Sequence, residues 1–307
     1  MFRFVSKIPD IADMKNILLL LLASSPLLHA ELPVAPGAEL KLVSEGFKFT
    51  EGPAADPEGN VFFTDQPNDR ILKWSVGTGE VTDFLKPAGR SNGLYFTPDG
   101  NLIACADEKS ELWNIDTATK EVTVLLSGYD GKLFNGPNDV WVHPSGGMFF
   151  TDPFYKRDYW EGRENSEQEK QRVFFLPKGA DKPVIADDTL TQPNGIIGTT
   201  DGKTLYVADI GANKTYRYAI KADHSLGEKE LFCEMGSDGM TLDSEGNLYL
   251  TGKGVTVFGK DGKKLGEIPV PEGWTANATF GGKEMKTLFI TAMDSLYSLE
   301  MSVEGIR

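Results

Sequence analysis

Six polar residues with oxygen-bearing side chains begin six similar segments of the chain. They are Glu51, Asn92, Asn138, Asn194, Asp238 and Asn277. Two carboxylates and four carboxamides, without His or Cys, form a donor set suited to a hard cation such as Ca²⁺, whereas Zn²⁺ prefers nitrogen or sulfur. The alternative is a turn, which is the more common role for Asn92 and Asn277, and Asp238 fits both roles. Glu51 has no turn role.

The six segments share one pattern: a polar start, an apolar stretch, a Gly-containing turn, a second apolar stretch and a stop. They cover Glu51–Asp65, Asn92–Asp107, Asn138–Asp152, Asn194–Asp209, Asp238–Gly252 and Asn277–Ala292. Their starts lie 41, 46, 56, 44 and 39 residues apart. Each segment predicts a hairpin, and alternating apolar stretches such as 111–116 and 121–126 predict a second strand pair. Four strands in about 45 residues is the spacing of a propeller blade.

The sequence therefore predicts an all-β, six-bladed β-propeller with four antiparallel strands per blade. The last segment is followed by one more strand, 295–299, near the end of the chain. We expect Leu40–Ser44 to supply the missing outer strand and close the ring. Because first strands line the channel of a propeller, the six polar residues should form a ring at one mouth. Residues 31–307 are thus expected to be a single domain.

Residues 1–30 resemble a secretory signal peptide. A basic segment at Met14–Asn16 precedes the apolar run Ile17–Ala23, a turn at Ser24–Pro26 and the small residue Ala30. The run is too short to span a bilayer permanently, and the alternative is a buried helix. Because acidic residues precede the basic segment, we expect Met14 to be the true start. The mature protein is then periplasmic or secreted, without membrane association.

The composition is that of an ordinary globular protein. The chain has 307 residues, 25% charged and 40% hydrophobic, with a net charge of −14. These values exclude collagen, wholesale disorder and a multi-span membrane protein, and the acidic balance argues against nucleic-acid binding. We expect a monomer or a weak dimer. The two cysteines, Cys105 and Cys233, are expected to be buried thiols, with a disulfide as the alternative.

Four motifs, each followed by its own hairpin, resemble those of the gluconolactonase/regucalcin (senescence marker protein) family over about residues 45–300. They are Glu51-Gly52-Pro53, Gly136-Pro137-Asn138-Asp139, Gln192-Pro193-Asn194-Gly195 and Ser237-Asp238-Gly239. The resemblance implies hydrolysis of sugar lactones. It also implies a divalent metal held by Glu51, Asn138, Asn194 and Asp238, as in the related calcium-dependent diisopropylfluorophosphatase, with Asp238 as the candidate catalytic base. Calcium is the first choice, with Zn²⁺, Mg²⁺ and Mn²⁺ as alternatives.

The expected substrate-binding residues come from three places. Some family members carry an Arg two residues before the middle Asn, where this chain has Gly136, so Arg90 is the candidate substitute. Asn92 and Asp139, which are expected at the same mouth of the channel as the metal, are also predicted to bind the substrate. The insertion 153–171 should overhang the metal as a lid, with Phe154, Tyr155 and Trp160 as a sugar-stacking wall; the alternative is a plain surface loop. Its tail, 161–172, is expected to be a loop or a short helix.

The predicted reaction is lactone opening by a metal and a carboxylate. A Ca²⁺ with only two carboxylate ligands keeps positive charge to polarise the lactone carbonyl, while Asp238 accepts a proton from the attacking water. No nucleophile triad competes, because His143 and His224 lie beside turns and follow no Gly-x-Ser-x-Gly elbow. Two alternatives remain: a calcium-dependent phosphotriesterase-like hydrolase, and a non-catalytic, calcium-stabilised propeller that binds a ligand.

Overall fold

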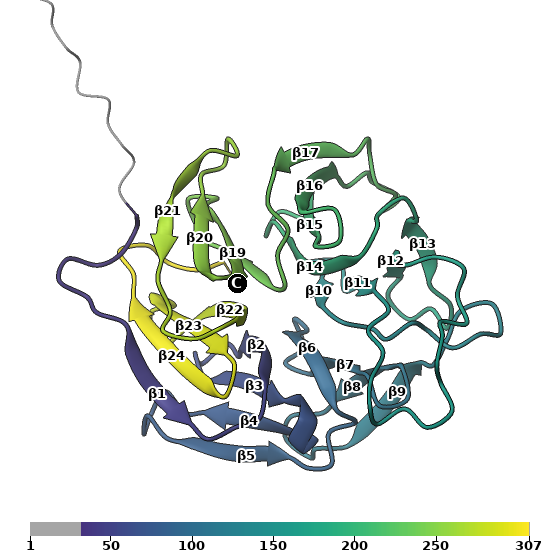
Figure 1. The fold of residues 1–307 in the computed structure, drawn as a ribbon, viewed down its shortest axis with the longest axis horizontal. Helices are drawn as coiled ribbons and strands as arrows, with labels where there is room; N and C mark the ends of the chain where they lie inside the picture. Colours follow the sequence, from purple (N-terminus) through teal and green to yellow (C-terminus); the bar gives the residue numbers. More distant parts are fainter. Residues whose placement is uncertain (1–31, 307) are drawn as a thin grey trace, which may run out of the picture. The chain divides into compact units, whose positions relative to one another are not determined.

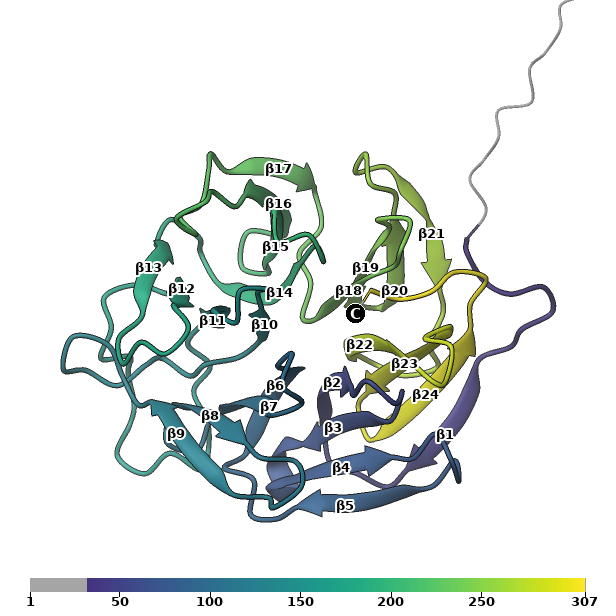
Figure 2. The same ribbon diagram turned by 180° about the vertical axis from the view of Figure 1, so that it is seen from behind.

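Six four-stranded antiparallel sheets surround a central channel in the computed structural model, which describes residues 32–306 (Figures 1 and 2). The predicted six-bladed β-propeller is confirmed. The first strand of each blade lies at the channel and the fourth lies at the rim. The expected signal peptide lies outside the described residues.

The strands follow the order of the sequence within blades one to five and over the three inner strands of blade six. In blades one to three they are β2 (Thr50–Ala55), β3 (Val61–Asp65), β4 (Arg70–Trp74), β5 (Val81–Leu85), β6 (Ser91–Phe96), β7 (Leu102–Ala106), β8 (Glu111–Ile115), β9 (Val122–Leu126), β10 (Val140–Val142), β11 (Met148–Asp152), β12 (Arg172–Leu176) and β13 (Val184–Asp187). In blades four to six they are β14 (Pro193–Gly198), β15 (Thr204–Asp209), β16 (Lys214–Ala219), β17 (Glu230–Cys233), β18 (Met240–Leu242), β19 (Leu248–Gly252), β20 (Gly254–Phe258), β21 (Lys264–Ile268), β22 (Thr275–Gly281), β23 (Thr287–Ala292) and β24 (Ser295–Glu300). One short 3-10 helix, η2 (Gln66–Asn68), follows β3.

The sixth blade is closed by a strand from the other end of the chain. Strand β1 (Lys41–Glu45) pairs antiparallel with β24, with Lys41 opposite Ser298 and Glu45 opposite Ser295. This pairing confirms the outer strand expected from residues 40–44. Strand β1 covers the edge of β24 that would otherwise be unpaired. Blade six therefore has four strands like the other blades, and the two ends of the described chain are joined within it.

The core lies between the blades, on both faces of their inner strands. Every residue of β3, β7, β11 and β19 is buried, because neighbouring blades cover both faces of these second strands. By contrast, the first three residues of the outer strand β9 are exposed. Burial on two faces explains why the second apolar stretch of each segment is nearly continuous rather than alternating.

Buried threonines near the ends of second strands fix the start of the next blade. The Thr64 hydroxyl donates to the carbonyl of Asn92 at 3.1 Å, and the Thr251 hydroxyl donates to the carbonyl of Ala276 at 2.7 Å. Both acceptors lie at or beside the polar residue that begins the following segment. These bonds therefore position the ring of polar residues against the neighbouring blade.

Three further expectations can be compared with the structure. Cys105 and Cys233 are both free and buried, which confirms the pair of thiols and rules out the disulfide. The tail of the insertion, 161–172, contains no helix: residues 161–171 are turns, bends and irregular backbone, and Arg172 begins β12. Within residues 32–306, no helix is long and apolar enough to cross a membrane.

Candidate active site

The six polar residues lie at one mouth of the channel. Four of them belong to the first strands β2, β6, β14 and β22, while Asn138 and Asp238 lie in the loops just before β10 and β18. All are buried except Asp238, which is half-buried. Neighbouring members are close: the backbone N–H of Gly93, next to Asn92, donates to the carbonyl of Asn138 at 2.7 Å. The ring predicted from the sequence is therefore present.

Asp238 is held by side chains from two other blades. Asn194 donates through Nδ2 to Asp238 Oδ1 at 3.0 Å, and Trp274 donates through Nε1 to Asp238 Oδ2 at 2.6 Å. The same Asn194 amide nitrogen donates to the Tyr155 hydroxyl at 2.9 Å. The orientation of the Asn194 amide follows from these two acceptors, and it turns Oδ1 away from them.

Asn194 Oδ1 is buried and has no hydrogen-bond partner within residues 32–306. Leaving a buried acceptor unpaired costs free energy, so such an atom is a candidate ligand for a cation or a donor. Glu51 orients its own carboxylate by accepting from the backbone N–H of Gly52 at 2.9 Å. A carboxamide oxygen without a partner, beside oriented carboxylates, is the arrangement expected of a hard-cation site.

The carboxylates of the ring have raised pKa values. Burial, and then the charge of Asp238, raise the pKa of Glu51 well above its usual range. Burial raises the pKa of Asp238 to about 6, although its hydrogen bonds with Trp274 and Asn194 lower it. Burial also raises the pKa of Asp139 to about 7. Neighbouring buried carboxylates repel one another, and a divalent cation bound to them would favour their ionised forms.

The donor set fits a hard divalent cation. Glu51 and Asp238 supply carboxylate oxygens, and Asn138 and Asn194 supply carboxamides, which is the ligand chemistry of Ca²⁺. No group of three or more His, Cys, Asp or Glu side chains suited to a metal occurs among the residues that the structure describes. A site made half of carboxamides is consistent with that observation, because carboxamides are not among those four residue types.

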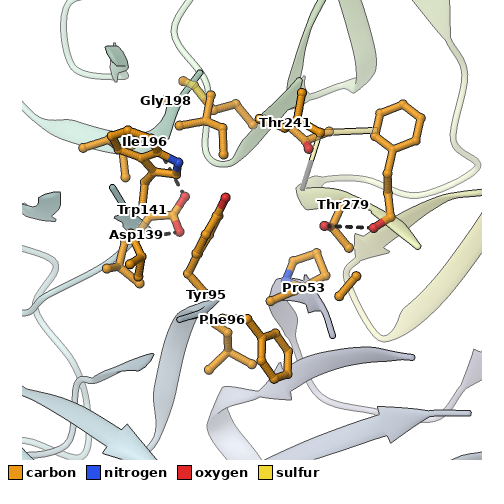
Figure 3. A pocket seen from close by; sticks show the side chains of 18 of the residues that line it. Pro53, Tyr95, Phe96, Asp139, Trp141, Ile196, Gly198, Thr241 and Thr279 are labelled. Carbon is orange, nitrogen blue, oxygen red and sulfur yellow. Dashed lines mark hydrogen bonds between the residues drawn. The ribbon is translucent and has the colours of Figure 1, made fainter. Parts of the chain in front are cut away.

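Asp139 is buried and follows the ring residue Asn138 directly in the chain. Its carboxylate accepts from the backbone N–H groups of Val140 at 2.9 Å and Ile196 at 3.4 Å. With Asn277, it lines a cavity of about 470 Å³ that extends down the channel toward the far ends of the first strands. Tyr95 points into this mostly apolar cavity (Figure 3). Asp139 and Asn277 thus lie where the ring meets the cavity.

The insertion 153–171, here called the lid, meets the ring through Tyr155. Its hydroxyl accepts the bond from Asn194 described above. Phe154 and Trp160 have ring centroids 5.9 Å apart, and Trp160 is buried with its Nε1 donating to the carbonyl of Asp107 at 2.9 Å. Tyr155 is therefore part of the site, while Trp160 anchors the base of the lid.

Arg90 is engaged by other parts of the protein. Its Nη1 donates to the carbonyl of Pro67 at 2.8 Å, and its guanidinium lies 4.5 Å from the ring centroid of Tyr159. The structure therefore places Arg90 in support of the lid. Gly136 leaves no space for a side chain, because a Cβ there would lie 2.6 Å from Asp107 Oδ1.

Sequence reasoning missed three residues of the site. Trp274 orients Asp238, and Asp107 binds Arg157 of the lid, whose Nε donates to Asp107 Oδ2 at 2.6 Å. Asp107 could have been noticed as the stop of the second segment, at the position of Asp65. Trp274 precedes the sixth segment by three residues, but no sequence pattern indicates which blade its indole contacts.

Comparisons with known proteins identify the family and support the fold. A family model described as "SMP-30/Gluconolactonase/LRE-like region" matches residues 49–294. A gluconolactonase from Zymomonas mobilis is 28% identical over 309 residues, covering 92% of this chain and 86% of its own. The structure of a gluconolactonase from Xanthomonas campestris superposes with a TM-score of 0.81 at 28% identity, covering 88% of this chain and 91% of its own.

A calcium-binding regucalcin from Agrobacterium tumefaciens shares the fold, with a TM-score of 0.72 at 23% identity, covering 89% of this chain and 96% of its own. The family match spans most of the chain and includes all six polar residues of the ring. The resemblance stated from the four motifs is thereby confirmed. The chain belongs to the SMP-30/gluconolactonase/LRE-like family.

Proposed function

We propose that this protein is a divalent-metal-dependent hydrolase that opens sugar lactones. The names of its gluconolactonase relatives support lactone hydrolysis. The observation that carries the metal is Asn194 Oδ1, a buried acceptor without a partner among the described residues, beside the carboxylate of Asp238. Glu51, Asn138, Asn194 and Asp238 would hold the cation.

The chemistry is the addition of water to an ester. Water oxygen attacks the lactone carbonyl carbon, the ring C–O bond breaks, and the product is a hydroxy acid that releases a proton at neutral pH. A bound divalent cation supplies a Lewis acid for the carbonyl oxygen. Asp238, fixed by Trp274 and Asn194, is positioned to accept the proton of the water. Tyr155 covers the ring from the lid side.

Calcium is the proposed metal. The structural relative named a calcium-binding regucalcin supports it, as does a donor set of oxygens alone. Mg²⁺, Mn²⁺ and Zn²⁺ are the alternatives to test in parallel. Mg²⁺ demands a tighter octahedral arrangement, and Zn²⁺ favours nitrogen and sulfur, so the affinity should be highest for Ca²⁺ in this series.

The experiment is a proton-release assay with glucono-1,5-lactone. The purified protein is stripped with EDTA and then reconstituted with each metal in turn. We expect a rate above that of buffer, lost after EDTA and restored by Ca²⁺. Asp238→Asn should abolish it, while Asp181→Asn, on an exposed loop, serves as the matched control. No rate above buffer with any of the four metals would contradict the proposal.

Two alternatives are separated by the same preparation. A diisopropyl fluorophosphate substrate in place of the lactone tests a phosphotriesterase. If neither substrate is hydrolysed but calorimetry still detects Ca²⁺ binding, the non-catalytic, calcium-stabilised propeller is favoured instead.

We further propose that the domain is exported and works as a monomer or a weak dimer. Residues 14–30 support export through their basic, apolar and small residues in order. Cell fractionation with N-terminal sequencing of the mature chain tests this, and sedimentation measures the oligomeric state. A cytoplasmic, unprocessed chain would contradict the export proposal.

A further inference from the structure

Arg157 of the lid lies beside the ring and is fixed by a buried carboxylate. Its Nε donates to Asp107 Oδ2 at 2.6 Å, and its guanidinium lies 5.4 Å from the ring centroid of Tyr155. Tyr155 in turn contacts Asn194. The positive charge of Arg157 also counteracts the raised pKa of both Glu51 and Asp238. Arg157 is therefore close to the proposed metal ligands.

Asp107 differs from its counterparts in the other blades. At the ends of their second strands, Asp65, Asp152 and Asp209 each accept backbone N–H groups from the loop that leads into their own blade. In blade two that role belongs to Asp69, which accepts from the backbone of Ala88 and Arg90. Asp107 is thereby free to bind the lid.

The contacts of Asp107 all serve the lid and its surroundings. Besides Arg157, its Oδ2 accepts from the Tyr159 hydroxyl at 2.6 Å and from Gln66 Nε2 at 3.3 Å. Its carbonyl accepts from Trp160. The missing side chain of Gly136 leaves the space that the Asp107 carboxylate occupies. This arrangement fixes the Nε side of the guanidinium and leaves its other nitrogens available.

The terminal nitrogens of Arg157 distinguish it from the other arginines nearby. Arg90 donates through Nη1 to Pro67, and Arg163 donates through its terminal nitrogens to Ser110, Phe134 and Asn135. Within the part of the chain that the structure describes, Arg157 donates only through Nε. A guanidinium carries five N–H donors, so four remain for a ligand.

We propose that Arg157 binds the substrate: its terminal N–H groups donate to adjacent hydroxyl oxygens of a polyhydroxylated lactone seated over the metal ring, and Asp107 positions it. The planar fork of a guanidinium matches two neighbouring oxygens. The inference rests on the proposed lactonase function and specifies its substrate class, a lactone with vicinal hydroxyl groups. It also names a different arginine from Arg90.

The test measures substrate binding and metal binding separately in the same variants. Arg157→Gln should raise KM for glucono-1,5-lactone, or lower kcat/KM, roughly 10- to 100-fold, the loss expected for hydrogen bonds from a charged donor. Ca²⁺ binding by calorimetry should be retained, because Arg157 carries no ligand oxygen, although the Ca²⁺ affinity will shift with the loss of a positive charge that acts on Glu51 and Asp238. Arg157→Lys should be intermediate, since it keeps the charge but loses the fork.

Asp107→Asn tests the positioning role separately. It should raise KM in the same direction with unchanged Ca²⁺ affinity, because it releases Nε without removing the guanidinium. Lys156→Gln is the matched control: it removes one exposed cation from the same lid and should leave KM and kcat unchanged. Thermal unfolding of each variant verifies that it is folded.

Binding of gluconate, the hydrolysis product, gives a readout that does not require turnover. Calorimetry on the Ca²⁺-loaded protein should show weaker gluconate binding by Arg157→Gln in the same proportion as the change in KM. An inactive wild type would defeat the proposed function, but gluconate binding would still decide the role of Arg157. An active wild type with unchanged KM and gluconate affinity in Arg157→Gln would overturn this inference, as would loss of Ca²⁺ binding in Arg157→Lys.

Discussion

The indole of Trp274 donates a hydrogen bond to Asp238 at 2.6 Å across the junction between blades six and five. Asn194 of blade four holds the other carboxylate oxygen at 3.0 Å. The carboxylate of blade five is therefore oriented by donors from the two neighbouring blades. Its direction depends on closure of the whole ring, so changes at either donor should affect metal binding without removing a charged ligand.

Replacing Trp274 by Phe should weaken Ca²⁺ binding. The substitution removes the donor to Asp238 Oδ2 while it keeps an aromatic ring, and loss of such a partner typically costs 10- to 100-fold in metal affinity. Calorimetry on EDTA-stripped protein measures the change. Trp113→Phe is the matched control, because that indole also donates to a carboxylate, Glu111, at 2.7 Å on blade two. Equal affinities in all three proteins would contradict this role for Trp274.

Replacing Gly52 by Ala should displace the neighbouring ring residues Glu51 and Asn92. Gly52 has a φ of +41°, and a Cβ there would lie 2.1 Å from the carbonyl oxygen of Asn92 on the next blade. Such overpacking typically costs about 1–3 kcal/mol, in addition to the cost of a positive φ. We expect a lower midpoint of thermal unfolding and weaker Ca²⁺ binding, because Glu51 moves with its neighbour.

Gly100→Ala is the control for backbone strain. Gly100 has a φ of +85°, but a Cβ there would meet nothing within 4 Å. Its unfolding midpoint should fall less than that of Gly52→Ala, and its Ca²⁺ affinity should equal that of the wild type. If both variants lost the same stability and kept full Ca²⁺ affinity, the close approach of Gly52 to blade two would have no role at the site.

The fold was predictable because it repeats. Six segments with the same turn and the same polar start leave few architectures, and the short last segment pointed to closure by residues 40–44. The ring was predictable for a related reason. Residues such as Glu51 and Asn194 occupy the same position in their blades, so strand direction alone places them at one mouth.

The contacts that orient the ring could not be predicted in this way. Trp274 reaches Asp238 from another blade, and Arg157 reaches Asp107 from an irregular insertion. Such contacts depend on the path of loops in three dimensions, which has no period in the sequence. The direction of the Arg90 side chain could not be predicted either: Arg90 is close to Asn92 along the chain, but its guanidinium contacts Pro67 and Tyr159.

Both cysteines should resist thiol reagents in the folded protein. Cys105 and Cys233 are free and buried, and burial raises the pKa of Cys233 to about 11 and the pKa of Cys105 as well. Because the thiolate is the reactive form, a disulfide reagent such as DTNB should react slowly with native protein. Two thiols should react in guanidinium chloride. Rapid reaction of one native thiol, lost in Cys233→Ser, would show that this residue is accessible.

The stability of the metal-free protein should fall as the pH rises from about 4 to about 7. Burial raises the pKa of Asp152 to about 7, although its hydrogen bonds with the backbone N–H groups of Gly136 and Asn135 lower it. An unfolded Asp titrates near pH 3.9, so the folded protein holds the extra proton between these values. Stability from this group is complete below about pH 4 and is lost toward pH 7, by at most about 1.4 kcal/mol per pH unit.

Urea unfolding in EDTA at several pH values measures this slope, and Asp152→Asn isolates the contribution. The variant carries no titrating group at this position, so its unfolding free energy should fall less steeply with pH, even if it is less stable throughout. Raised pKa values at Glu51, Asp139 and Asp238 act in the same direction and remain in both proteins, so the difference between the two slopes reports Asp152 alone. Asp181→Asn, on an exposed loop, should reproduce the wild-type slope. Parallel slopes for Asp152→Asn and the wild type would mean that Asp152 is ionised in the folded protein across this range, held so by the two backbone N–H groups.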